Sequence, residues 1–401
     1  MDNINNNKVS RIVWLSSVFL ALFIDVRALN WTLVYGGFVP IEEGGLMANI
    51  YLYTAILLSV CAVCSFTVTT KRMNYSGLLL SSYLLFWYYV TLCFWGPPET
   101  SILMFLVMTV FALIIPQFIC IDARIFLKTV MLLPSIAIFR INEVFIIPSG
   151  WSMQLPMDVS YGFLVPIISS IVYWKTFFKS ESGWKKWLTV TSFSCNVVFL
   201  ILLLLYGSRG PLLSIVLLFC FYYICKWENG QVTVNYSKRR RIMIFLTIFL
   251  LTGIFAFSIL SSLLESFGIK SYAIDKMIQL GDEGNLSNGR GNLNALTMNY
   301  VLDRPIWGYG LDRFNALTNM QYPHNLFMQL LFDGGIVLLL IVFIPVYKSI
   351  KVFFKNCIYS EYILVVTLFF VSVPGSMVSG NIWHIVPLWV FIGSILKLKK
   401  I

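Results

Sequence analysis

Long apolar runs, separated by short polar or charged segments, dominate the chain. A bilayer core about 30 Å thick requires about 20 mostly apolar residues in each spanning helix. Twelve runs of roughly this length fit between the charged positions. They cover residues 11–28, 46–69, 75–95, 101–121, 126–147, 161–178, 187–206, 209–225, 242–262, 324–347, 361–377 and 382–396. The pattern predicts an all-α polytopic membrane protein with about 12 transmembrane helices.

The positions of Lys and Arg predict which helix ends face the cytoplasm. Basic residues in short loops resist translocation and stay on the cytoplasmic side. With the N-terminus inside, 21 of the 29 Lys and Arg residues fall on that side. The eight on the outer face are Arg27, Arg140, Arg209, Lys270, Lys276, Arg290, Arg304 and Arg313. We therefore expect a multi-pass protein whose N- and C-termini are both cytoplasmic.

One predicted connection is far longer than the others. Residues 263–323 lie on the outer face between spans 9 and 10, and loops of this length are usually functional or disordered. Within this loop, NLNALTMNYVL places Leu293, Leu296 and Tyr300 on one helical face. We therefore expect three parts: transmembrane helices 1–9 in residues 1–262, a loop with short helices in 263–323, and helices 10–12 in 324–401.

Composition and charge narrow the class of protein. The chain is 58% hydrophobic and 12% charged, against roughly 25% charged residues in soluble domains. The formal charge of +11 gathers on the predicted cytoplasmic side, so topology accounts for it and no nucleic-acid partner is needed. The eight cysteines lie in apolar runs or beside basic loops, without partnering histidines. We expect neither a metal site nor a cofactor.

Outer-face arginines are exceptions to the charge rule, so each needs a reason. Arg209 lies in YGSRGPLL, a tight turn in which Ser208 is a possible N-cap and Pro211 suits the first helical turn. A helix N-terminus offers unpaired N–H groups and a positive dipole end, and an arginine beside it makes a phosphate-binding site. The alternative is an arginine that anchors at the lipid headgroups.

The outer loop carries further candidates. Arg290, between two glycines in LSNGRGN, begins the predicted loop helix and could contact a phosphate or a sugar; the alternative is a solvated loop arginine. Trp307, Tyr309 and Tyr322 offer aromatic faces of the kind that stack on sugar rings. Trp and Tyr are, however, also common at membrane interfaces.

Both histidines lie near the predicted outer face. His324 begins the tenth span, where the positive end of the helix dipole disfavours protonation, and a neutral imidazole can accept a proton from a hydroxyl. A lone histidine is otherwise more often structural. His384, in NIWHIVP, has bulky neighbours, and we interpret it as a packing or interfacial residue.

Asp333 would lie about 13 Å along the same helix from His324, at about 1.5 Å per residue. An ionisable group at membrane depth indicates a functional role with a specific partner. The alternative is a kinked, half-exposed helix entry loosened by Gly334 and Gly335.

Three segments together resemble a known family. GSRGPLLS, GRGNLNALTMNYVLDRPIWGYGLDRF and PHNLFMQLLFDGG are similar to the signature segments of the O-antigen polymerase (Wzy type) and O-antigen ligase superfamily of bacterial inner membranes. The likeness is close over roughly residues 205–340, while the first half of the chain resembles the family only in hydropathy. Each motif alone is weak, but their order and spacing across one outer loop are specific.

The resemblance implies a GT-C-like, metal-independent glycosyltransferase with a periplasmic loop. Its substrates would be oligosaccharides linked to undecaprenyl pyrophosphate, and flippase and chain-length regulator proteins would be candidate partners besides membrane lipids. Arg209 and Arg290 would bind the pyrophosphate, and His324 would orient or deprotonate the acceptor hydroxyl. Asn325, Tyr309 and Tyr322 would complete the substrate site, supported by Asp333 and Ser208.

Several functions share this pattern. The apolar, Phe-rich and Leu-rich character favours a polymerase, which extends the chain on another lipid-linked repeat, over a ligase, which transfers finished glycan to a lipid A core sugar. A transporter or flippase would place polar groups near the midplane and is often built from repeated halves, neither of which is evident. A noncatalytic scaffold would leave Arg209 and His324 without a shared purpose.

Overall fold

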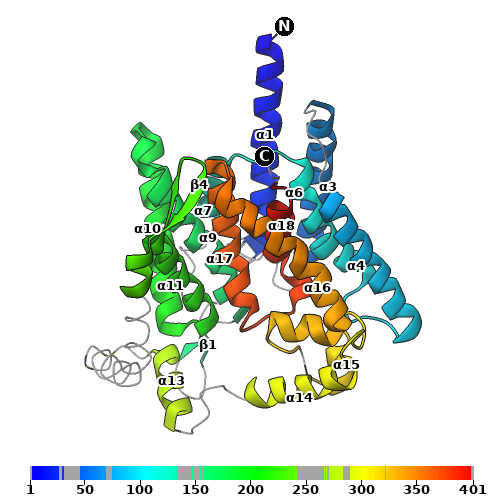
Figure 1. The fold of residues 1–401 in the computed structure, drawn as a ribbon. Coiled ribbons are helices and arrows are strands. Elements are labelled where there is room, and N and C mark those ends of the chain that lie inside the picture. The colour runs from blue at the N-terminus through cyan, green and yellow to red at the C-terminus, as the bar shows by residue number, and fades with distance from the viewer. Residues whose placement is uncertain are drawn as a thin grey trace.

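The computed structural model describes most of the chain. The described residues are 2–26, 29–30, 46–68, 75–133, 135, 147–148, 153–154, 157–241, 266, 268, 271–282, 290–320 and 322–398. Helices dominate them, in agreement with the predicted all-α class (Figure 1). The predicted ninth span, 242–262, lies outside the described residues.

Helices occupy most of the described residues of the predicted spans, but Ile147 at the end of span 126–147 lies in a strand, as does Cys225 at the end of span 209–225. The long helices are α1 (Asp2–Ile24), α3 (Leu46–Val68), α4 (Tyr75–Phe94), α9 (Met157–Thr176), α10 (Gly183–Tyr206), α11 (Arg209–Ile224), α16 (Leu326–Lys355) and α17 (Tyr359–Ser376). Shorter helical pieces are α5 (Ile102–Phe105), the π-helix η1 (Leu106–Phe111), α6 (Ala112–Phe118), α7 (Ala123–Leu132), η3 (Phe178–Ser180), η4 (Ile382–His384) and α18 (Val386–Leu396). Among the described residues, five helices are long and apolar enough to cross a membrane, namely those at 47–65, 75–94, 183–206, 326–355 and 359–376.

Two short antiparallel hairpins were not predicted. They pair β1 (Ile147–Pro148) with β2 (Met153–Gln154) and β3 (Cys225–Glu228) with β4 (Gln231–Val234). The second hairpin turns at Asn229 and Gly230, with φ of 50° and 80°. Asn-Gly is the typical sequence of a two-residue hairpin turn, so the signal for this hairpin was present in the sequence.

The core lies around α17 and α18. Nearly every side chain of α18 is buried, and α6 packs so closely on it that a Cβ at Gly393 would lie 2.2 Å from the Leu113 carbonyl oxygen. The outer helices expose large apolar side chains instead, such as Val63, Leu79 and Trp187, which are 66%, 70% and 74% exposed. Small residues between helices and apolar residues on the outside suit a bundle surrounded by lipid.

A cluster of charged and polar side chains joins α7, α9 and the start of α10. Glu181, whose side chain is 2% exposed, pairs with Arg124 at 3.0 Å and Lys128 at 3.1 Å, and Tyr173 donates a hydrogen bond to it. Burial opposes ionisation, but these hydrogen bonds prevail and lower the pKa of Glu181 to about 2. The cluster lies near the same end of the bundle as the β3–β4 hairpin.

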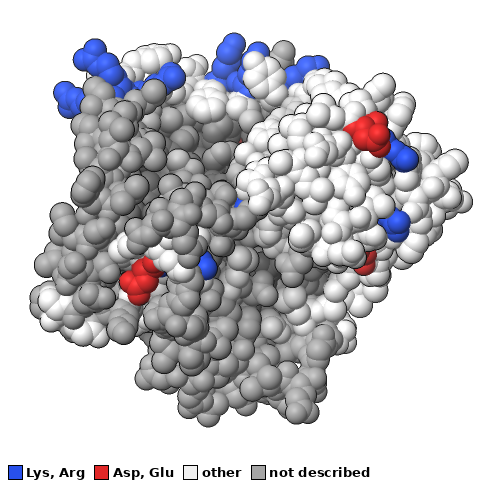
Figure 2. All heavy atoms as spheres, turned by 90° about the horizontal axis from the view of Figure 1, so that it is seen from below, with Lys and Arg blue, Asp and Glu red and all other residues white. Residues whose placement is uncertain are grey.

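The opposite end carries the predicted loop, with α13 (Tyr272–Asp282), α14 (Arg290–Asp303) and α15 (Phe314–Thr318) (Figure 1). The loop helix predicted from NLNALTMNYVL is confirmed as α14. Its buried face packs into a second hydrophobic cluster, formed by Val301, Tyr309, Phe314 and Phe332 with Leu293, Tyr300 and Leu331 around them. Seen from this end, uncharged residues make up most of the described surface (Figure 2).

This loop is joined to α16 through a break in the helix. Gly334 and Gly335 have non-helical backbone angles, and Gly335 has a φ of 62°. The break leaves backbone groups that pair with the loop: Tyr309 N donates to Phe332 O at 2.8 Å, Gly310 N to Asp333 O at 3.0 Å, and Ile336 N to Pro305 O at 2.8 Å. The Gly-Tyr-Gly turn of the loop and the Asp-Gly-Gly break of α16 are therefore joined by backbone hydrogen bonds.

Candidate functional site

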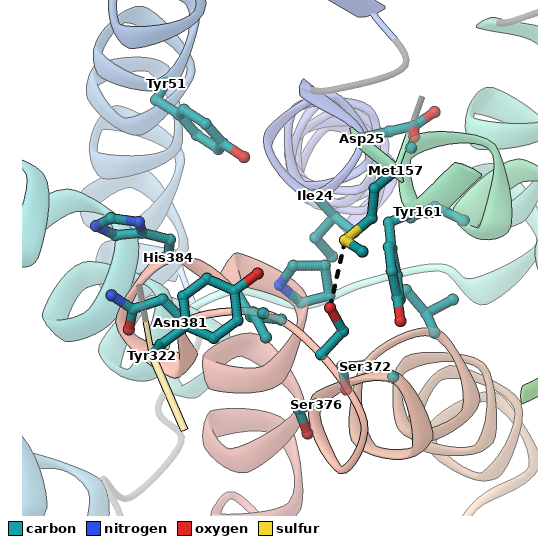
Figure 3. A pocket seen from close by; sticks show the side chains of 18 of the residues that line it. Ile24, Asp25, Tyr51, Met157, Tyr161, Tyr322, Ser372, Ser376, Asn381 and His384 are labelled. Carbon is teal, nitrogen blue, oxygen red and sulfur yellow. Dashed lines mark hydrogen bonds between the residues drawn. The ribbon is translucent and has the colours of Figure 1, made fainter. Parts of the chain in front are cut away.

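A cavity of about 410 Å³ lies beside the ends of α1 and α9, between them and the segment from α17 to η4. Tyr322 and His384 lie on one side of it, and Met157 and Tyr161 on the other (Figure 3). Its wall is rich in aromatic rings, hydroxyls and amides, from Tyr51, Tyr161, Tyr322, Ser372, Ser376, Ser379, Asn315 and Asn381. Aromatic faces and hydrogen-bonding groups around a concave site suit a sugar ligand.

Two carboxyl groups also line the cavity. Asp25 is fully buried, and within the described part of the chain neither of its oxygens has a hydrogen-bond partner. Glu99 is exposed at the rim. Partial burial, and next the charge of Asp312, raise the pKa of Glu99. These groups add acceptors for the hydroxyl groups of a ligand.

His324 and Tyr322 lie together at this end of α16. Their rings are 4.3 Å apart between centroids, and Tyr322 also lines the cavity. His324 is half-buried with a φ of 55°, a left-handed conformation that few non-glycine residues adopt and that is often found at functional sites. Within the described residues its Nδ1 is buried without a hydrogen-bond partner.

The structure also connects His324 with Arg290. Burial, and next the positive charge of Arg290, lower the pKa of His324. The neutral imidazole expected from the sequence is therefore favoured. The cause differs from the expectation, however, because it is burial and a neighbouring cation rather than the dipole of α16.

Arg209 is the first residue of α11, as predicted, but its side chain lies outside what the structure describes. Ser208 occupies the N-cap position without making the expected capping hydrogen bond. Its hydroxyl is buried without a partner in the described part of the chain. A Cβ at Gly210 would lie 2.0 Å from the hydroxyl of Tyr161, so the start of α11 lies against the wall of the cavity.

Asn325 and Tyr309 have structural roles in this geometry. Asn325 is the N-cap of α16, and its side-chain oxygen accepts from the backbone N–H groups of Phe327 and Met328 at 2.9 and 3.2 Å. Tyr309 donates a hydrogen bond to Asp303 and stacks on Phe332 at 5.2 Å. Burial, and next Asp303, raise the pKa of Tyr309 to about 12. The structure thus places Tyr309 in the loop core and outside the cavity lining.

Asp333 is fully buried, so the half-exposed helix entry considered from the sequence is wrong, although the kink at Gly334 and Gly335 is confirmed. The predicted partner exists: the indole N–H of Trp383 donates to Asp333 Oδ2 at 2.7 Å. The indole N–H of Trp87 donates to the backbone oxygen of Asp333 at 3.2 Å. Asp333 therefore ties α16 to η4 and α4.

A polar network beside the cavity was missed by the sequence reasoning. Asp312, 5% exposed, accepts from Thr100 N at 2.8 Å and from Asn381 Nδ2 at 2.6 Å. The Thr100 hydroxyl lies 2.5 Å from Asp312 Oδ2 and 2.6 Å from His384 Nε2. His384 is thus half-buried in a hydrogen-bonded wall of the cavity. The expectation that it only packs or anchors is incomplete.

The network extends into α16. Gln329 Nε2 donates to Asn381 Oδ1 at 2.7 Å, and Ile382 N donates to Gln329 Oε1 at 3.1 Å. A buried polar network whose groups are satisfied holds its members in one arrangement. The only sequence signal for it was the polar character of Asp312, Gln329 and Asn381 within apolar surroundings, because its members are spread over some 280 positions of the chain.

Among the described residues, no group of three or more His, Cys, Asp or Glu side chains is arranged to hold a metal ion. The cavity is lined instead by the imidazole of His384 with hydroxyl and amide groups, and Tyr322 links this lining to His324, which feels the charge of Arg290. Such a set can bind an anionic group beside a polar, ring-shaped ligand and can move a proton.

Comparison with curated proteins gives no match. The family model described as O-antigen ligase matches residues 195–343. This stretch contains all three motifs and the segments that begin at Arg209, Arg290 and His324. Residues 195–343 are therefore similar to the O-antigen ligase family, which confirms the resemblance to the O-antigen polymerase and ligase superfamily.

Proposed function

We propose that this protein is an O-antigen polymerase of the bacterial inner membrane. It joins undecaprenyl-pyrophosphate-linked oligosaccharide repeats at the periplasmic face, without a metal. The observation that carries the proposal is that Tyr322, which lines a cavity rich in aromatic rings and hydroxyls, has its ring 4.3 Å from the ring of His324, whose pKa is lowered by burial and next by the charge of Arg290. The proposed donor has an anionic pyrophosphate at one end and a sugar at the other, and the site must bind both.

In the proposed reaction an acceptor hydroxyl attacks the anomeric carbon of the donor sugar. The new C–O bond forms as the bond from that carbon to the pyrophosphate oxygen breaks, and the pyrophosphate leaves on its lipid with the electron pair. Arg209 and Arg290 bind the pyrophosphate and offset its growing charge. His324 orients the acceptor hydroxyl or takes its proton. Membrane lipids, a flippase and a chain-length regulator are the proposed partners.

The test is complementation of a strain that lacks the protein. Arg290→Ala and His324→Ala should abolish long-chain polysaccharide on a lipopolysaccharide gel, while immunoblots show normal amounts of inserted protein. Arg304→Gln is the matched control, because Arg304 is an exposed arginine of the same loop, with a 51% exposed side chain and a 3.9 Å ion pair to its neighbour Asp303. Unchanged glycan ladders in both site variants would refute the assigned residues.

A ligase is the second candidate, because the matching family model is described as O-antigen ligase. The two activities use the same donor end and differ in the acceptor. The deletion strain separates them. Lipid A core carrying a single repeat identifies a polymerase, whereas bare core with accumulated lipid-linked polymer identifies a ligase.

A further inference from the structure

His384 and His324 have opposite electrostatic surroundings. His324 lies near Arg290, whose positive charge disfavours an imidazolium. His384 lies one hydroxyl away from the buried carboxylate of Asp312. A base that gains a proton during a reaction is helped by a nearby anion and hindered by a nearby cation. The surroundings of His384 are therefore the better suited to proton transfer.

The hydrogen bonds also fix the orientation of His384. A carboxylate only accepts, so the single hydroxyl proton of Thr100 goes to Asp312 Oδ2. The Thr100 oxygen then accepts from His384, which places the proton of a neutral imidazole on Nε2 and the accepting lone pair on Nδ1. A second carboxylate contact comes from Asn381, which is itself held by Gln329. The chain Asp312–Thr100–His384 is therefore braced by α16.

We propose that His384, held by Asp312 through Thr100, takes the proton of the attacking acceptor hydroxyl in the cavity. The O–H bond breaks toward His384 Nδ1 as the hydroxyl oxygen bonds to the anomeric carbon and the pyrophosphate leaves with its electron pair. Asp312 stabilises the imidazolium through Thr100. Of the two roles proposed for His324, orienting the acceptor hydroxyl then remains. This inference rests on the proposed glycosyl transfer and assigns the base within it.

The placement of His384 supports this role. It lies on the cavity wall together with Tyr322, whose ring is 4.3 Å from the ring of His324 between centroids. Glu99 and Asp25 are the acidic groups that line the cavity, and Asp312 lies behind its wall, one hydroxyl away from His384. Arg313, which donates to Pro97 O at 2.9 Å, is the nearby loop cation. The donor and acceptor sugars would meet between the two imidazoles.

The test uses the full-length protein in proteoliposomes, with lipid-linked repeat units extracted from the deletion strain. His384→Gln keeps an N–H donor for Thr100 but removes the basic nitrogen. We expect kcat to fall by about 100-fold, the lower range of losses for a general base, while KM changes less than about threefold. An unchanged kcat would overturn the proposal.

Thr100 supplies the matched pair. Thr100→Ser keeps the hydroxyl and should retain nearly wild-type kcat, whereas Thr100→Val keeps the shape without the hydroxyl and should lose at least about 10-fold. Equal rates for the two Thr100 variants, at equal melting temperatures, would also overturn it. Failure of the proposed function gives a different result, because the wild-type protein would then join no glycan. If only this inference fails, His384→Gln remains active and His324→Ala is inactive.

Discussion

For His324, the sequence correctly predicted that the neutral imidazole is favoured, but the structure gives a different cause for the lowered pKa. Its proximity to the start of an apolar helix indicated a neutral imidazole, and the structure favours the same form. The half-buried ring, the left-handed backbone and the neighbouring Arg290 could not be read from the sequence, because Arg290 lies 34 positions away.

The pKa of His324 is directly measurable, because the chain has only two histidines. In a His384→Gln background, ¹⁵N-histidine labelling leaves one imidazole to titrate by NMR. We expect its midpoint below 6.5, the ordinary value. Arg290→Gln should raise the midpoint toward 6.5 without reaching it, because burial is the larger cause and remains. A midpoint at or above 6.5 in the parent protein contradicts the described surroundings.

The lowered pKa of His324 also determines the direction in which protein stability changes with pH. The folded protein binds the His324 proton less tightly than the unfolded chain does, so unfolding takes up a proton at low pH. The contribution of His324 to stability is complete above pH 6.5 and is lost as the pH falls through its lower folded pKa. His324→Gln should flatten this part of the pH dependence of the melting temperature. An equally steep dependence in the variant would assign it to other groups.

At the scale of elements, the break in α16 joins helix and loop. The paired glycines predicted a kink, and it is there. The packing of these glycines against the Gly308–Gly310 turn could not be predicted, because the sequence of neither segment indicates that the two lie close together in space. A Cβ at Gly335 would lie 2.2 Å from the backbone oxygen of Ile306, and a Cβ at Gly308 2.3 Å from that of Phe332.

Gly335→Ala tests this joint. We expect it to lower the free energy of unfolding by about 3 kcal/mol. The alanine would have to adopt a left-handed φ, and its Cβ would clash with a backbone oxygen that cannot move away. Gly183→Ala is the control, since its φ of 56° is similar but a Cβ there has nothing within 4 Å. That change should cost about 1 kcal/mol. Thermal melting in detergent compares them, and equal losses would show that the loop does not pack on the break.

At the scale of the whole molecule, the apolar pattern predicted the all-α class and most of the described helices, but it did not predict how the helices pack. Runs of apolar residues are set by the lipid surroundings and can be read along the chain. The central position of α18 could not be predicted, because an apolar run is expected both in a helix surrounded by other helices and in a helix surrounded by lipid. The His384 network was missed for the same reason, since it depends on which helix ends meet.

The site end and the hairpin end of the molecule are joined by one helix. After its break at Gly334 and Gly335, α16 continues over the 20 residues 336–355, which gives about 30 Å at about 1.5 Å per residue, the approximate thickness of a bilayer core. It begins beside His324 and ends beside the β3–β4 hairpin, where Cys357 N donates to Gly230 O at 2.9 Å and Trp227 Nε1 donates to Cys357 O at 3.1 Å. The two ends should therefore lie in opposite compartments.

Cysteine labelling tests this arrangement in a variant whose eight native cysteines are replaced and which still makes polymer. Ala316→Cys, exposed on α15 at the site end, should react with a membrane-impermeant maleimide in cells whose inner membrane is intact. Gln231→Cys, exposed on β4, should react only after that membrane is opened. The reason is that the proposed donor is a lipid-linked sugar at the periplasmic face, so the proposal requires the end with His324 to face the periplasm. Equal labelling of both positions in intact cells, or the reverse order, would place the site away from its substrate and exclude the proposed reaction.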